Sequence, residues 1–163
     1  MILDSLKEGK PVPIGLPTHE AGGYGDGTLC QIGISQTLYC GAKYVPFAPK
    51  GINWIAQGNS DVISYNFSGC IMAVFTHEGT RKVCHISTGN NQNCLDEWQK
   101  IKKASSQVFE FKPSDFISYK NTQFLGCYGL ITRDLRTYSI TVGISGGQRI
   151  VAGVKKARLL RPY

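Results

Sequence analysis

Cys70 and His85 have the spacing in this chain that best suits a chemical reaction. Cys70 opens an apolar run over residues 71–75, and His85 lies in a return run over 80–87, with Gly79 in the turn between them. Two short β-rich runs around a glycine-containing turn predict a hairpin. Residues opposed across a hairpin have Cβ atoms about 4.5–5.5 Å apart. At that distance an imidazole can take the thiol proton and hold a thiolate as a nucleophile.

The register of this hairpin decides whether the pair can meet. If the loop is centred between His77 and Glu78, Cys70 faces His85 directly. A two-residue turn at Glu78-Gly79 places His85 diagonal to Cys70 on the same face. A three-residue turn without a bulge puts them on opposite faces, because side chains alternate along a strand.

Three further residues fit a reaction at Cys70. Ser64 lies on the strand leading into the turn, and its hydroxyl can exchange a hydrogen bond with His85 to fix which imidazole nitrogen faces the sulfur. Ser68 and Gly69 directly precede Cys70, and a glycine there lets the backbone turn and present N–H groups to an oxyanion.

A purely structural interpretation competes with the catalytic one. Cys70 would then be a buried core cysteine, and His85 a histidine satisfied by a backbone carbonyl. His77 is a rival base, but its place at the hairpin tip predicts a solvated side chain far from Cys70.

The surrounding elements predict an α+β fold with two packed sheets, mixed or antiparallel, and one main helix. The helix is expected at about residues 94–106, with Asn93 as its N-cap and an apolar face of Leu95, Trp98 and Ile101. The segment 1–28 is rich in proline and glycine and predicts irregular structure. Strands are expected over the following ranges: 28–34, 38–47, 52–56, 61–67, 107–111, 127–132, 137–143 and 149–154.

Composition narrows the function classes. The 163 residues suit one domain, 1–163, and the net charge of +7 favours an acidic partner. The basic excess gathers over 149–161, which reads either as a solvated strand and tail or as a binding surface. The six cysteines are spread thinly without a Cys-x-x-Cys pair, so buried thiols are expected in place of disulfides or a zinc ribbon.

The motif Phe67-Ser68-Gly69-Cys70, with His85 on the following strand, resembles the catalytic domain of the cytotoxic necrotizing factors. It also looks like the wider group of bacterial cysteine-dependent glutamine deamidases, which includes the lethal-factor type and the chemotaxis protein CheD. Several members place a threonine six residues before the cysteine to orient the imidazole, and Ser64 stands at that position here. The resemblance covers roughly residues 64–85.

This resemblance implies a protein-glutamine deamidase that requires no metal or organic cofactor. Cys70 would attack a glutamine carboxamide, backbone N–H groups near Gly69 would hold the oxyanion, and His85 would protonate the departing ammonia. The family acts as toxins and effectors on small GTPases or translation factors, so the implied partner is a target protein with an exposed glutamine, and the chain a monomer. It would be secreted or translocated into the target-cell cytosol, although residues 1–8 carry no secretory signal pattern.

Two other functions stay open at the level of sequence. One is another cysteine hydrolase, such as a papain-like protease or a cell-wall amidase, although Cys70 opens a strand and papain-like cysteines start a helix. The other is a non-enzymatic basic binding module. Nucleic acid is the less favoured ligand, because no aromatic stacking motif is interleaved with the basic residues.

Overall fold

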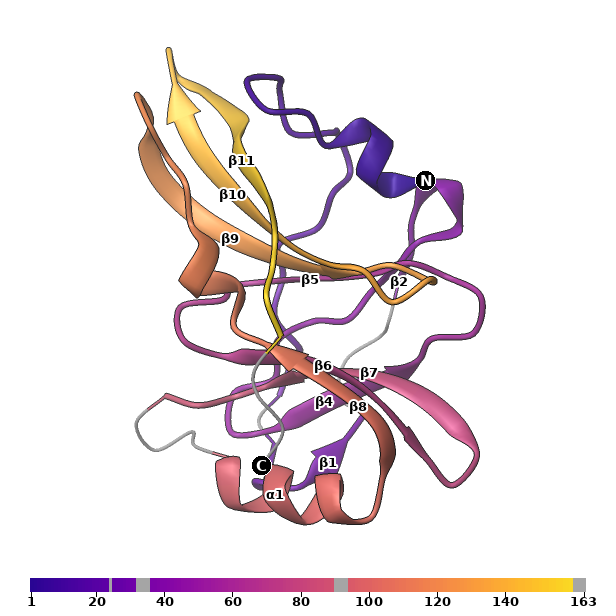
Figure 1. Cartoon of the computed structure of the whole chain (residues 1–163). Coiled ribbons are helices and arrows are strands. Elements are labelled where there is room, and N and C mark those ends of the chain that lie inside the picture. The colour runs from indigo at the N-terminus through magenta and orange to yellow at the C-terminus, as the bar shows by residue number, and fades with distance from the viewer. Residues whose placement is uncertain (24, 32–35, 90–93, 160–163) are drawn as a thin grey trace.

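The computed structural model describes residues 1–23, 25–31, 36–89 and 94–159, and it confirms two sheets and one main helix. One sheet has the strand order β1-β4-β7-β6-β8 and the other β11-β10-β9-β5-β3-β2 (Figure 1). Both sheets are mixed, because β1 pairs with β4 and β3 with β5 in parallel, while the other strand pairs are antiparallel. The five-stranded sheet consists of β1 (Leu29–Cys30), β4 (Ile52–Ala56), β6 (Ile71–His77), β7 (Thr80–Ile86) and β8 (Ser106–Phe111).

The six-stranded sheet contains the three strands that follow β8 in the sequence and three earlier strands. Its members are β2 (Gln36–Thr37), β3 (Lys43–Tyr44), β5 (Val62–Tyr65), β9 (Gln123–Ile131), β10 (Thr137–Ser145) and β11 (Gln148–Lys156). The single strand expected over 38–47 is wrong. The short element η2 (Tyr39–Gly41) stands there instead, and Cys40 and Gly41 within it have positive, non-helical φ angles of 59° and 72°, which interrupt the extended chain. Residues 32–34 of the first expected strand lie outside the described residues.

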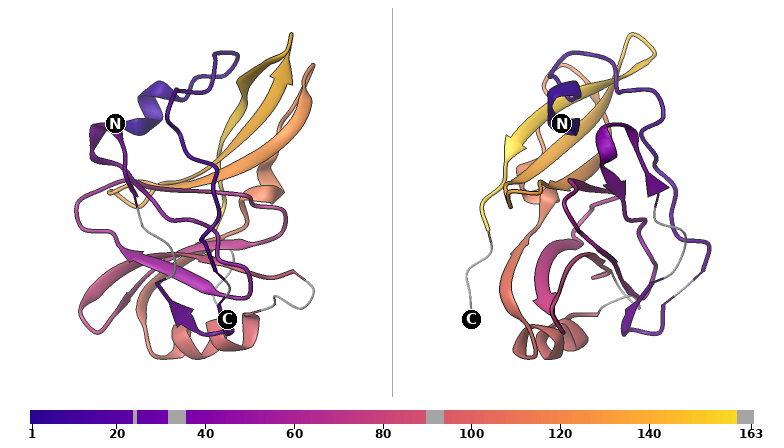
Figure 2. Two further views of the ribbon diagram at one scale, coloured as in Figure 1. Left: turned by 180° about the vertical axis from the view of Figure 1, so that it is seen from behind. Right: turned by 90° about the vertical axis from the view of Figure 1, so that its right-hand side faces the viewer.

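The molecule is built of four layers, which are the N-terminal segment, the six-stranded sheet, the five-stranded sheet and the main helix (Figure 2). The side chains between the two sheets form one buried cluster, which includes Val45, Phe67, Cys70 and Met72. A second cluster lies between the outer face of the six-stranded sheet and the N-terminal segment, and a third between the five-stranded sheet and the helix.

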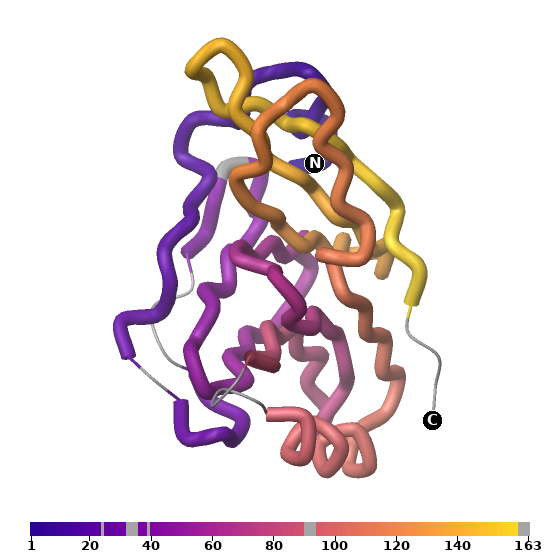
Figure 3. Tube along the Cα trace, turned by 90° about the vertical axis from the view of Figure 1, so that its left-hand side faces the viewer, coloured from indigo at the N-terminus to yellow at the C-terminus, as the bar shows by residue number. Residues whose placement is uncertain are grey.

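The N-terminal segment contains a short helix η1 (Ile2–Ser5) and then irregular chain, as the proline and glycine content predicts. It runs along one side of both sheets (Figure 3). Hydrogen bonds fix it there: Tyr44 Oη donates to the His19 carbonyl at 2.7 Å, and the Ala21 N–H donates to the Phe47 carbonyl at 2.8 Å. The segment therefore covers apolar strand residues that would otherwise face solvent.

Helix α1 (Leu95–Lys103) falls within the expected range and ends before β8 begins at Ser106. Its N-cap residue is Cys94, and the expected cap, Asn93, lies outside the described residues. The helix buries Trp98 and Ile101 against the sheet, as its apolar spacing predicts. A further short helix, η3 (Pro113–Phe116), links β8 to β9. In the part of the chain that the structure describes, no helix has the length and apolar character needed to cross a membrane.

A buried charge cluster attaches α1 to β8. Glu110 is 4% exposed and accepts hydrogen bonds from the indole N–H of Trp98 and, at 3.0 Å, from the ammonium of Lys102. Removing one partner of a buried ion pair leaves the other charge uncompensated, which costs about 3–5 kcal/mol.

We predict that Glu110→Ala lowers the free energy of unfolding by about 3 kcal/mol or more, because Lys102 and Trp98 both lose a buried partner. The exposed Lys103→Ala, on the same helix, should change it by less than about 0.5 kcal/mol. Urea unfolding followed by circular dichroism measures both. Equal losses in the two variants would show that the cluster does not hold the helix.

Candidate active site

The β6–β7 hairpin brings Cys70 and His85 to the same face of the five-stranded sheet. Met72 pairs with His85, and His77 pairs with Thr80, so the turn has two residues. The register with Cys70 directly opposite His85 is therefore wrong, and the diagonal alternative is right. Glu78 and Gly79 have φ angles of 52° and 76°. Two consecutive positive φ angles are typical of the type I′ turn, whose twist matches that of the strands it joins.

Ser64 reaches His85 from the opposite sheet. Its Oγ lies 2.8 Å from His85 Nδ1, so the hydrogen bond expected between these residues is present. The same Oγ lies 2.5 Å from the Val45 carbonyl, which can only accept. Both side chains are fully buried. The hydrogen bond therefore connects β5 of one sheet to β7 of the other.

These two contacts determine the tautomer of His85. A serine hydroxyl has one proton, and here it goes to the Val45 carbonyl. The Ser64 oxygen must then accept, so Nδ1 of His85 carries the ring proton. In a neutral imidazole the other nitrogen, Nε2, is left with a free lone pair. This Nε2 is buried and has no hydrogen-bond partner among the described residues.

Aromatic rings enclose the imidazole. The Phe67 ring stacks on it with centroids 4.0 Å apart and planes 11° apart, and the Phe47 ring lies 5.0 Å away. Burial lowers the pKa of His85 to about 3, because a charged ring would lose its hydration there. The hydrophobic position of the Phe-Ser-Gly-Cys motif therefore supplies a wall against which His85 lies flat.

Cys70 ends a tight turn between β5 and β6. Gly69 has a φ of +123°, a conformation that side-chain-bearing residues rarely adopt, which explains a glycine before the cysteine. The N–H groups of Asn66 and Phe67 both donate to the Cys127 carbonyl, at 3.1 and 3.2 Å, and hold this turn against β9. Ser68 is exposed, so any contribution from it to the site comes from its backbone.

Thr88 is a residue of the site that the sequence did not reveal. Its hydroxyl donates to the Gly69 carbonyl at 2.8 Å. Burial raises the pKa of the Cys70 thiol, and hydrogen bonds from the Thr88 N–H and hydroxyl partly offset this rise. Thr88 follows β7 by two residues and could have been found only by knowing that the turn before β6 lies beside the end of β7.

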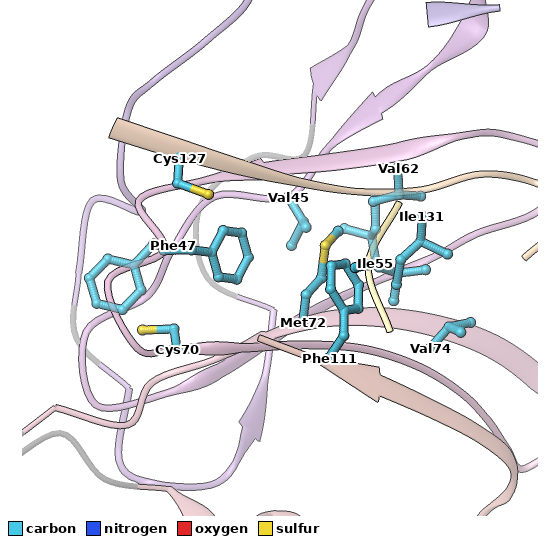
Figure 4. Close-up of a cluster of buried hydrophobic side chains, with 13 residues drawn as sticks. Val45, Phe47, Ile55, Val62, Cys70, Met72, Val74, Phe111, Cys127 and Ile131 are labelled. Carbon is cyan, nitrogen blue, oxygen red and sulfur yellow. The ribbon is translucent and has the colours of Figure 1, made fainter. Parts of the chain in front are cut away.

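The thiol and the imidazole are both neutral in this arrangement, because burial disfavours the charged form of each. The expected thiolate–imidazolium ion pair is therefore not the resting state. Cys70 is 8% exposed and belongs to the cluster between the sheets, where it faces the same buried layer as Cys127 (Figure 4). It makes no hydrogen bond to His85 Nε2, so reaction at this site requires the thiol to turn toward the ring.

The other two histidines have partners elsewhere. His77 lies at the far end of β6 from Cys70, beside Lys82, and His19 lies against Tyr44. All six cysteines are free, and four are buried, as the sequence predicts: Cys70, Cys84, Cys94 and Cys127.

No protein-family model, curated protein or solved structure matches this chain.

We predict that His85 makes stability fall as the pH decreases. Its pKa is about 3 in the folded chain and about 6.5 unfolded, so the unfolded chain binds the extra proton between these values. Stability is complete above about pH 6.5 and should drop by about 2 to 3 kcal/mol between pH 6.5 and 4.5. Urea unfolding at each pH measures this.

The comparison variants are His85→Gln, which removes the titrating ring, and His19→Gln, which changes an exposed one. The first should flatten the profile over this range and the second should leave it unchanged. If the free energy of unfolding of His85→Gln falls with pH as steeply as that of the unmodified chain, then His85 is protonated in the folded chain.

Proposed function

We propose that this chain is a cysteine-dependent protein-glutamine deamidase with Cys70 as nucleophile and His85 as base. The observation that carries the proposal is the hydrogen-bond sequence from His85 Nδ1 to Ser64 and on to the Val45 carbonyl. It holds the imidazole in one tautomer, with the lone pair of Nε2 on the face of the hairpin where Cys70 also lies. A base held by a third group beside a nucleophile is the arrangement that acyl transfer needs.

The neutral resting pair sets the order of proton transfers. As the Cys70 sulfur forms a bond to the carboxamide carbon, His85 Nε2 takes the thiol proton, and the carbonyl π electrons move onto oxygen. The imidazolium then gives that proton to the amide nitrogen as the C–N bond breaks, and ammonia leaves a thioester. Water, losing a proton to Nε2, attacks the thioester, and the sulfur leaves to regain its proton. The products are glutamate and ammonia.

Backbone groups of the turn support the oxyanion in this proposal. Gly69 holds its positive φ without a side chain, so the peptide units on either side of it can present N–H groups close to the Cys70 sulfur. Thr88 binds the Gly69 carbonyl and thereby limits rotation of the same peptide unit. The turn is anchored on β9 through the Cys127 carbonyl, so these donors would be in place before a substrate arrives.

The closed surroundings favour a side-chain amide over a peptide bond as the substrate. Cys70 is 8% exposed, and Phe67 and Phe47 lie against the imidazole, which is fully buried. A glutamine side chain is narrow and ends in its carboxamide, whereas a peptide bond brings the chain on both sides with it. We infer that the substrate is an accessible glutamine of another protein, and that the chain acts as a bacterial effector on a small GTPase or translation factor.

We predict that the purified chain converts glutamine to glutamate in proteins of a eukaryotic cytosolic lysate. Tryptic mass spectrometry should find peptides that gain about one dalton, without new cleavage, and ¹⁸O-labelled water should add about two more because water supplies the new oxygen. Cys70→Ser should reduce this by at least about 1,000-fold, since it removes the nucleophile.

Ser64 offers a graded test of the same reaction. Ser64→Ala should slow deamidation by about 10- to 100-fold, as expected for loss of a residue that orients a catalytic histidine, whereas Ser64→Thr keeps the hydroxyl and should stay close to the unmodified chain. His85 is fully buried, so its replacement by alanine would also leave a cavity in the core. His85→Gln, which fills more of its volume than alanine, is therefore the preferred loss-of-base variant. Lysate deamidation that persists in Cys70→Ser would overturn the proposal.

A further inference from the structure

A polar groove lies along the edge of strand β11, away from the Cys70 turn. Its volume is about 460 Å³, and its walls come from β11, from the chain just before β9 and from the N-terminal segment. These segments gather at the same end of the molecule (Figure 1). Two lysines, two hydroxyl residues and one acid supply most of its polar groups: Lys120, Lys155, Ser118, Thr122 and Glu8. We call it the β11 groove.

A second, smaller hollow adjoins the β11 groove and differs in character. It has a volume of about 300 Å³ and shares Ser118 and Lys120 with the groove, but its other lining residues are Ile117 and Tyr119. Tyr119 is 52% exposed, and its ring lies 5.6 Å from that of Phe124, which is 42% exposed. A cationic hollow therefore continues into one with exposed aromatic surface.

The β11 groove carries a net positive charge, because Lys120 and Lys155 line it together with a single acid. Its acid, Glu8, already accepts the N–H of Val154 at 3.1 Å. Neither Lys120 nor Lys155 has an ion-pair partner among the described residues. Lys156 at the end of the same strand and Arg158 just after it are also exposed. The sequence had left open whether the basic excess over 149–161 is a solvated tail or a binding surface. Lys155 lines the β11 groove, which favours a binding surface for this part of the basic segment.

The walls are fixed by packing and by hydrogen bonds. A Cβ built on Gly153 would lie 2.8 Å from the Cβ of Ser118, so strand β11 and the segment before β9 are in direct contact. The Ser118 N–H donates to Thr141 Oγ1 at 3.0 Å. On the other side, the Gly9 N–H donates to the Val151 carbonyl at 2.8 Å. A ligand that enters the groove does not have to order these walls, which lowers the entropic cost of binding.

We propose that the β11 groove and its neighbouring hollow dock an extended, acidic segment of a partner protein, with an acidic side chain between Lys120 and Lys155 and an apolar one against Tyr119. Two small hollows of different character, placed side by side, suit consecutive side chains of a peptide better than one compact ligand. The proposal is independent of the chemistry at Cys70.

The test is fluorescence anisotropy with labelled decapeptides and the full chain. The probe alternates glutamate with leucine and contains no glutamine, so binding does not depend on deamidation. Two comparison peptides alternate glutamate with serine and lysine with leucine, and a single-stranded oligonucleotide tests for general polyanion binding. The groove variant is Lys120→Gln/Lys155→Gln, and the control, Lys100→Gln/Lys103→Gln on α1, has the same net charge.

We expect the glutamate–leucine peptide to bind, the two comparison peptides to bind more weakly, and the groove variant to lose about tenfold in affinity through two charge contacts. The α1 control should stay within about twofold of the unmodified chain, since it has lost the same net charge elsewhere. Equal losses in both variants, or tighter binding of the oligonucleotide than of the peptide, would overturn the proposal. Failure to deamidate any protein would leave this result unaffected.

Discussion

The hydrogen bond between Ser64 and His85 is the constraint on which the rest of the site depends. It joins the two sheets through their buried faces, in a layer made mostly of hydrophobic side chains. A polar pair in such a layer is tolerated only when its groups are bonded, and the Val45 carbonyl completes the pairing. Of the polar atoms in this pair, His85 Nε2 is left without a hydrogen-bond partner among the described residues. A buried acceptor without a partner is costly, and its position on the face of the hairpin that also carries Cys70 is the chemical reason to regard it as a base.

The turn that carries Cys70 contributes in three ways that follow from its sequence. Phe67 covers the imidazole, Gly69 allows the reversal of the chain, and the carbonyl of Gly69 binds Thr88. Burial keeps both the thiol and the imidazole neutral until a substrate arrives.

The sequence predicted those features that depend on local pattern. Alternation and turn residues gave the two-sheet architecture, and apolar spacing gave α1 with Trp98 and Ile101 buried. The Ser64–His85 contact was also predicted. The direct register of the hairpin was wrong because turn geometry at Glu78-Gly79, and not symmetry about the loop, sets the pairing. Thr88 and the Val45 carbonyl could not be predicted, since each reaches the site through packing between segments distant in sequence. The walls of the β11 groove come from three such segments.

The most direct measurement of this account is the protonation of the two His85 ring nitrogens by ¹⁵N NMR of histidine-labelled protein at neutral pH. The hydrogen bonds of Ser64 require Nδ1 to carry the proton and Nε2 to be bare, and replacing Ser64 with alanine should remove this preference. A spectrum in which Nε2 is the protonated nitrogen, or in which His85 is a cation, would contradict the account, because no base would then face the cysteine.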